Sequence, residues 1–76
     1  MLSGVGGMRV RVGDIVTNGG EPCYMRNSVF GGVIERYQGR TIFTVIQHDN
    51  GTYYYKVLAP DGKTGFIHIL DLELVG

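Results

Sequence analysis

The residues of this 76-residue chain that could carry out chemistry are few and scattered. His48 and His68 are the two histidines, and acidic residues do not recur around them at the spacing of metal ligands. Cys23 is the single cysteine, so neither an internal disulfide nor a cysteine-based zinc site can form, and we expect a small, half-buried apolar residue. The sequence therefore predicts no catalytic residues, no metal or other cofactor and no small-molecule substrate. We do not expect an enzyme.

Aromatic residues are better candidates for a binding surface. Tyr53, Tyr54 and Tyr55 are consecutive, and in a strand they alternate between the two faces. Tyr53, Tyr55 and Val57 then share one face, and Tyr54 lies on the other. One face must be the core, so at least one tyrosine is exposed or packs across strands. Cross-strand packing is the simpler interpretation, and stacking on a ligand or a base is the functional alternative.

A basic and aromatic hairpin tip is expected at Arg36-Tyr37-Gln38-Gly39-Arg40. Arg36, Tyr37 and Arg40, together with Tyr55, form the surface that we would assign to RNA or single-stranded nucleic acid, because arginines contact phosphates and rings stack on bases. The charge balance adds little support, since seven Lys and Arg residues face seven Asp and Glu residues in the whole chain.

Length and composition restrict the partners and the compartment. A domain of this size has a thin core, so association between subunits would add useful stability and a homo-oligomer is expected. No apolar run approaches the roughly 18 residues of a membrane span, so no membrane partner is predicted. The unpaired cysteine suggests a reducing compartment, which makes the cytoplasm the expected location.

The elements that must position these residues are short strands. Alternating or β-branched runs predict a first strand at 8–12 that continues at 15–16 after a bulge, and further strands at 29–37, 41–46, 53–58, 65–69 and 71–74. Turn residues predict reversals at Gln38-Gly39, Asp49–Gly51 and Pro60–Gly62. The segment from Thr17 to Ser28 is rich in glycine and is expected to be a loop. The one helical piece expected is a single 3₁₀ turn around Ile69 to Asp71.

Together these elements predict an all-β fold, a small, strongly bent, partly open antiparallel barrel of five or six strands. Residues 1–7 are expected to form a Gly-rich N-terminal arm, and residues 8–76 the single barrel domain. Alternation predicts that the mostly buried residues include Val10, Val12, Phe43, Val45, Val57, Ile67 and Leu72.

The tail Gly65-Phe66-Ile67-His68-Ile69-Leu70-Asp71-Leu72-Glu73-Leu74 resembles the closing segment of Src-homology-type-3-like barrels. In that family a Gly-aromatic-Ile-Pro run leads through a 3₁₀ turn into a final strand. The resemblance implies that Ile67 and Leu72 are core. It also implies a ligand face made of Phe66, one of Tyr53 or Tyr54, and the residues at His68 and Asp71.

The sequence departs from that family at functional positions. The family's proline stands here as His68, its groove tyrosine as Asp71, and its Ala-Leu-Tyr-Asp-Tyr-type motif as Arg-Val-Gly-Asp-Ile-Val. Recognition of polyproline needs stacked aromatic slots, so that activity is not expected. Bacterial, KOW-type, Tudor-like and Sm-like small barrels look similar, and the tail does not separate them. The leading expectation is a non-catalytic protein–protein interaction or assembly module, and the alternative is a small barrel that binds RNA or single-stranded nucleic acid.

Overall fold

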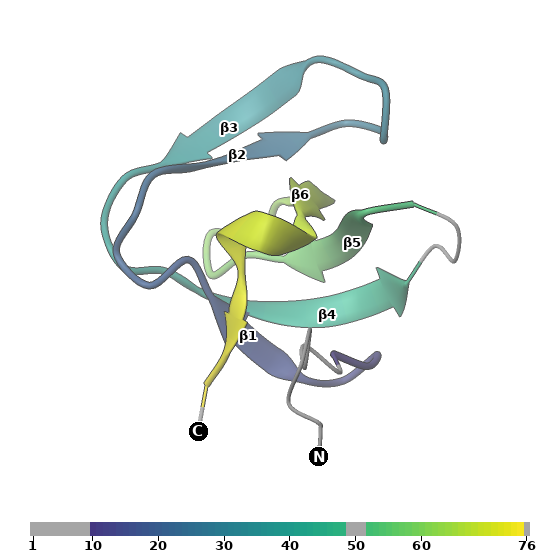
Figure 1. Ribbon diagram of the computed structural model, residues 1–76. Coiled ribbons are helices and arrows are strands. Elements are labelled where there is room, and N and C mark those ends of the chain that lie inside the picture. Colours follow the sequence, from purple (N-terminus) through teal and green to yellow (C-terminus); the bar gives the residue numbers. More distant parts are fainter. Residues whose placement is uncertain (1–9, 49–51, 76) are drawn as a thin grey trace.

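The computed structural model describes residues 10–48 and 52–75, and these residues form an all-β fold (Figure 1). One antiparallel sheet has the order β3-β2-β6-β5-β4-β1-β7. Its strands are β1 (Ile15–Thr17), β2 (Cys23–Arg26), β3 (Val33–Tyr37), β4 (Ile42–His48), β5 (Tyr54–Leu58), β6 (Thr64–His68) and β7 (Glu73–Leu74). In Figure 1 the β2–β3 hairpin lies on one side, β4 and β1 lie opposite, and β5 and β6 lie between them. The expected small, partly open barrel is confirmed.

The core lies on the inner face of the bent sheet, where alternate residues of neighbouring strands meet. Its buried apolar residues are Val10, Val16, Cys23, Met25, Phe43, Val45, Tyr55, Val57, Ala59, Ile67 and Leu72. Six of the seven predicted core residues are among them, and Val12 is the exception with 61% of its surface exposed. The chain turns there, because the Asp14 amide donates to the Arg11 carbonyl at 3.0 Å, and the turn ends the alternation. The first two residues of the predicted strand 8–12 lie outside the described residues, as do arm residues 1–7.

The segment expected to be a loop contains a strand, which raises the strand number to seven. Cys23 and Met25 point into the core and Tyr24 points out, and this short alternation is hidden between glycines and polar residues. β2 pairs with β3, so the strand predicted from position 29 begins at Val33 instead. Val29 and its neighbours form the turn of this hairpin, which the Asn27 amide helps close by donating to the Gly32 carbonyl at 3.1 Å.

The hairpin predicted at Gln38-Gly39 is wrong, because β3 and β4 are not neighbours in the sheet. This segment crosses from one side of the barrel to the other. The buried amide side chain of Asn18 holds it in place, since Nδ2 donates to the Gly39 carbonyl at 3.0 Å and Oδ1 accepts from the Thr41 amide at 2.8 Å. Gln38 and Gly39 therefore link two parts of the barrel and do not close a two-stranded ribbon.

The turn at Pro60–Gly62 is confirmed. Gly62 has a φ of 90°, which suits glycine, and its amide donates to the Ala59 carbonyl at 3.0 Å. The predicted 3₁₀ turn is present as η1 (Ile69–Asp71) between β6 and β7. The turn predicted at Asp49–Gly51 lies outside the described residues, although β4 and β5 on either side of it pair antiparallel.

Gly65 allows β2 to approach β6 closely. A Cβ atom on Gly65 would lie 2.7 Å from the carbonyl oxygen of Arg26 and would run into the Met25 side chain. At this crossing Arg26 and Phe66 are register partners. The glycine therefore joins the β2–β3 hairpin to the rest of the sheet and places Arg26 beside Phe66.

Cys23 is fully buried, more than the expected half. Burial raises the pKa of its thiol to about 11, and the nearby Asp71 carboxylate acts in the same direction. The thiol is therefore protonated at neutral pH and serves as a small apolar core residue.

Candidate functional site

Aromatic and basic side chains occupy the outer face of the sheet across four adjacent strands. On β5 and β6, Tyr54 is the register partner of His68, and Lys56 is the partner of Phe66. The row continues through Arg26 on β2 to the pair formed by Tyr24 and Arg36 on β2 and β3. We name this surface the aromatic-basic face, and it consists of Tyr24, Arg26, Arg36, Tyr54, Lys56, Phe66 and His68.

The cations of this face lie against aromatic rings. The Lys56 Nζ atom is 5.9 Å from the centroid of the Phe66 ring, and the Arg36 guanidinium carbon is 5.9 Å from the centroid of the Tyr24 ring. Each of these cation–π contacts is worth about 0.5–1 kcal/mol at an exposed site. Arg26 is held differently, because its Nη1 donates to the Gly31 carbonyl at 3.0 Å in the β2–β3 turn. The contacts orient three cations without neutralising them.

The aromatic-basic face contains no carboxylate. Its residues alternate along β2, β5 and β6 with buried residues, and the other outward positions of β5 and β6, Leu58 and Thr64, are uncharged. Within residues 10–48 and 52–75, both ion pairs belong to Lys63, which is not on this face. Three positive charges are thus collected on one surface of a chain whose formal net charge is zero. A surface of this kind attracts anions.

One end of the face is a cluster of three rings. The Tyr54 ring meets the His68 ring edge-on at 5.1 Å, and the Tyr53 ring stacks near His68 at 6.1 Å with 26° between the planes. His68 Nδ1 accepts a hydrogen bond from the Leu70 amide at 3.1 Å. An open pocket of about 270 Å³ lies beside these rings, lined by Tyr53, His68, Ile69 and Leu70. Tyr53 and Leu70 are 69% and 84% exposed.

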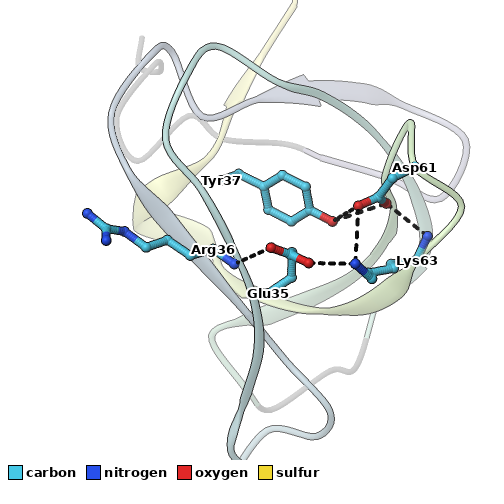
Figure 2. A network of polar contacts seen from close by, with 5 residues as sticks. All are labelled: Glu35, Arg36, Tyr37, Asp61 and Lys63. Atoms are coloured by element: carbon cyan, nitrogen blue, oxygen red, sulfur yellow. Dashed lines mark hydrogen bonds and ion pairs between the residues drawn. The ribbon is translucent and has the colours of Figure 1, made fainter.

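A second polar region links β3 to the β5–β6 turn (Figure 2). The Tyr37 hydroxyl donates to the Asp61 carboxylate at 3.0 Å, and Lys63 Nζ contacts Glu35 at 2.5 Å and Asp61 at 3.7 Å. Figure 2 shows the Arg36 guanidinium pointing away from these groups. We name Glu35, Tyr37, Asp61 and Lys63 the polar network. These contacts connect β3, the end strand of the sheet, to the β5–β6 turn and help close the barrel.

Electrostatics within the polar network stabilise its charges. The hydrogen bond to Glu35 raises the pKa of Lys63, and the same contact lowers the pKa of Glu35. The backbone amide of Lys63 lowers the pKa of Asp61, and the Tyr37 hydroxyl adds to that effect. Burial raises the pKa of Tyr37, and its hydrogen bond to Asp61 raises it further. At neutral pH the network is therefore a neutral phenol, two carboxylates and one ammonium group.

Four of the five residues assigned to a ligand face from the family resemblance lie together. Tyr53, Tyr54, Phe66 and His68 lie on adjoining parts of β5 and β6 or just before β5. Asp71 does not join them. It lines a different pocket of about 350 Å³, together with Glu21, Glu73 and other residues. The two pockets share Leu70, so an acidic pocket adjoins the one at the end of the aromatic-basic face.

The four residues assigned to nucleic acid are not brought together. Arg36 lies on the aromatic-basic face, but Tyr37 belongs to the polar network and Arg40 lies in the exposed connection before β4. Tyr55 is 4% exposed and packs in the core, so its ring is not available for stacking on a base. The predicted hairpin tip does not exist, because β3 and β4 do not pair.

Sequence reasoning missed Tyr24, Arg26 and Lys56. The first two lie in β2, which was expected to be part of a loop, and their place beside Phe66 depends on a long-range pairing. Lys56 could have been found, because it alternates with Tyr54 on the strand face opposite to Tyr55 and Val57.

In residues 10–48 and 52–75, histidine, cysteine and acidic side chains form no group of three that could hold a metal ion. The same residues contain no helix that is long and apolar enough to cross a membrane. Comparisons of the chain with protein-family models, with curated proteins and with solved structures find no match.

Proposed function

We propose that this protein is a non-catalytic, cytoplasmic binding module whose aromatic-basic face binds single-stranded nucleic acid. The observation that supports the proposal is the collection of three cations beside the exposed Tyr24 ring and the half-buried Phe66 ring, on a surface without a carboxylate. Phosphates are attracted to Arg26, Arg36 and Lys56, and bases can stack on the rings between them. The partner can be RNA or DNA, because neither kind of contact depends on the 2′-hydroxyl.

We also propose that the barrel is Src-homology-type-3-like. The proposal is supported by η1, which lies between β6 and β7 where the resemblance expects a single 3₁₀ turn before the final strand. The strongly bent sheet and the buried Ile67 and Leu72 agree with the same pattern. The proposed ligand surface includes three residues of the expected ligand face, Tyr54, Phe66 and His68, and extends over β2 and β3.

The affinity should be modest and sensitive to salt. Three phosphate contacts to a single strand correspond to a slope of about −2 when the logarithm of the association constant is plotted against the logarithm of salt concentration. Stacking on each exposed ring adds roughly 1–3 kcal/mol. Micromolar binding at low salt is the expected range.

Fluorescence anisotropy with labelled single-stranded RNA and DNA oligonucleotides tests the proposal. We expect Lys56→Gln combined with Arg36→Gln to weaken binding at least tenfold and to make the salt slope shallower by about 1.4. Lys63→Gln is the control for the loss of one positive charge, here from a residue already paired with carboxylates. Equal losses in the double variant and in the control would reject the aromatic-basic face as the site.

Protein–protein association is a second candidate, and a different surface favours it. Ile15, Ile42, Ile46 and Leu58 are each about 40% exposed on the outer face of β1, β4 and β5. Ile15 and Leu58 are both register partners of Thr44, so the aliphatic side chains continue across three strands. We propose that a second copy of the chain covers this surface. Light scattering should show a dimer that Ile42→Ser weakens. A monomer at micromolar concentration would reject the association.

A further inference from the structure

The pocket at the end of the aromatic-basic face is an apolar site with room for one planar base. It is lined by the Tyr53 and His68 rings, which are within 26° of parallel with centroids 6.1 Å apart, and by the aliphatic side chains of Ile69 and Leu70. Its lining is almost entirely apolar, while the surface that leads to it carries cations. From this geometry we propose that the pocket binds one nucleobase of the strand that crosses the aromatic-basic face.

Two contacts fix the orientation of the His68 ring in this pocket. His68 Nδ1 is occupied by the Leu70 amide, so in the neutral imidazole the proton is on Nε2, which is then a hydrogen-bond donor. The Tyr54 ring braces His68 edge-on at 5.1 Å and fixes its plane. The imidazole is therefore held in one orientation by η1 on one side and by β5 on the other.

The exposed walls of the pocket also need an explanation. Tyr53 is 69% exposed and Leu70 is 84% exposed, although both are large and apolar. A stacked base would cover the Tyr53 ring, and Leu70 would pack against the base. Stacking together with a single donor does not distinguish one base from another, so we expect little sequence preference.

A proline-rich peptide is the competing occupant, because aromatic-lined pockets also accept proline rings. The acidic pocket adjoins this one at Leu70, and the cations that favour nucleic acid lie on the aromatic-basic face. Lys56 lies on the same face of β5 as Tyr54. On β6 its register partner is Phe66, which is also the register partner of Arg26 on β2. A phosphate backbone matches these cations, whereas a neutral polyproline segment leaves them without partners.

The inference rests on the proposed function, and the experiment separates the two. 2-Aminopurine, a base whose fluorescence falls on stacking, is placed at each position of an oligothymidylate in turn. With the full chain we expect strong quenching at one position. Tyr53→Leu should abolish that quenching and weaken binding about tenfold, within the range for loss of one stacked base. Tyr53→Phe should retain both.

Phe30→Leu is the control for loss of an exposed ring, because Phe30 is 97% exposed in the β2–β3 turn and does not line the pocket. Position-specific quenching that survives in Tyr53→Leu would contradict the binding of a base in this pocket, and the proposed function would still stand. Absence of any binding by the unaltered chain would overturn both. Displacement of the oligonucleotide by a proline-rich peptide, with the loss of that displacement in Tyr53→Leu, would assign the pocket to peptide instead.

Discussion

Tyrosine beside a cation occurs in two regions of this barrel with opposite consequences. In the polar network the Tyr37 hydroxyl and the Lys63 ammonium group are both bound to Asp61, and Lys63 also pairs with Glu35. On the aromatic-basic face the Arg36 guanidinium lies over the Tyr24 ring, and this face offers it no carboxylate. In the first region the charges pair with one another and stabilise the fold. In the second region the cations have no carboxylate partner on their face.

Neighbouring residues of one strand separate the two regions. Tyr37 and Glu35 point to one side of β3, and Arg36 between them points to the other, as Figure 2 shows. The side on which a residue lies therefore decides whether its charge meets an internal partner. The presence of tyrosines and cations alone does not reveal this difference, because both regions contain them.

The largest expected effect is on the core that supports both regions. Ile67 is fully buried on β6, and Ile67→Ala should lower the free energy of unfolding by about 2–5 kcal/mol. A domain of this size has little more stability than that to lose. Thermal unfolding followed by circular dichroism measures the loss. Ile34→Ala, at a 44% exposed position, is the control and should change stability by less than about 1 kcal/mol. An unchanged melting temperature in Ile67→Ala would contradict the core assignment.

The second prediction tests the crossing that places Arg26 beside Phe66. Gly65→Ala should cost about 1–3 kcal/mol, because the added methyl group meets the Arg26 carbonyl and the Met25 side chain and forces β2 away from β6. Chemical denaturation measures this cost. Gly39→Ala is the matched control, since a Cβ there has no neighbour within 4 Å, and it should change stability by about 0.5 kcal/mol or less. If the two variants are equally stable, the close approach of the strands is not as described.

The third prediction makes the same substitution in both regions. Tyr37→Leu removes a ring that packs edge-on against Phe43 at 5.2 Å, so it should cost roughly 1 kcal/mol of stability and leave oligonucleotide affinity unchanged. Tyr24→Leu should leave stability within about 0.5 kcal/mol and weaken binding severalfold, since its ring is exposed beside Arg36. Denaturation and anisotropy on both variants measure the four quantities. If each variant loses stability and affinity together, the division between the two regions fails.

The sequence predicts the parts of this fold that depend on nearby residues. The β5–β6 hairpin, its turn at Pro60–Gly62 and η1 follow from turn chemistry and alternation within about ten residues. Tyr53, Tyr54, Phe66 and His68 come together for the same reason, because they belong to one hairpin and its immediate flanks.

The remaining parts depend on pairing between distant segments. β2 is short and surrounded by glycine and polar residues, and its position is fixed by contact with β6 about forty residues later. The Gln38-Gly39 pair has the composition of a tight turn, yet the buried Asn18 amide binds that segment from another part of the chain. Local preference was overridden by tertiary contacts at both places, and Tyr24, Arg26 and Arg40 were misplaced as a result.

The smallest expected effect is the pH dependence of the polar network. A double-mutant cycle between Glu35→Gln and Lys63→Gln measures the coupling energy of this pair. The folded-state pKa of Glu35 is lowered, so its contribution is complete above its ordinary value of 4.5 and is lost as pH falls through the folded value. The pKa of Lys63 is raised, so its contribution is complete below 10.5 and is lost as pH rises through the folded value. Coupling should therefore be constant between about pH 5 and 10 and decline on both sides.

Since both side chains are partly exposed, 1 M salt should weaken the coupling between Glu35 and Lys63. Coupling that persists at pH 2 would show that packing, and not charge, connects β3 to the β5–β6 turn.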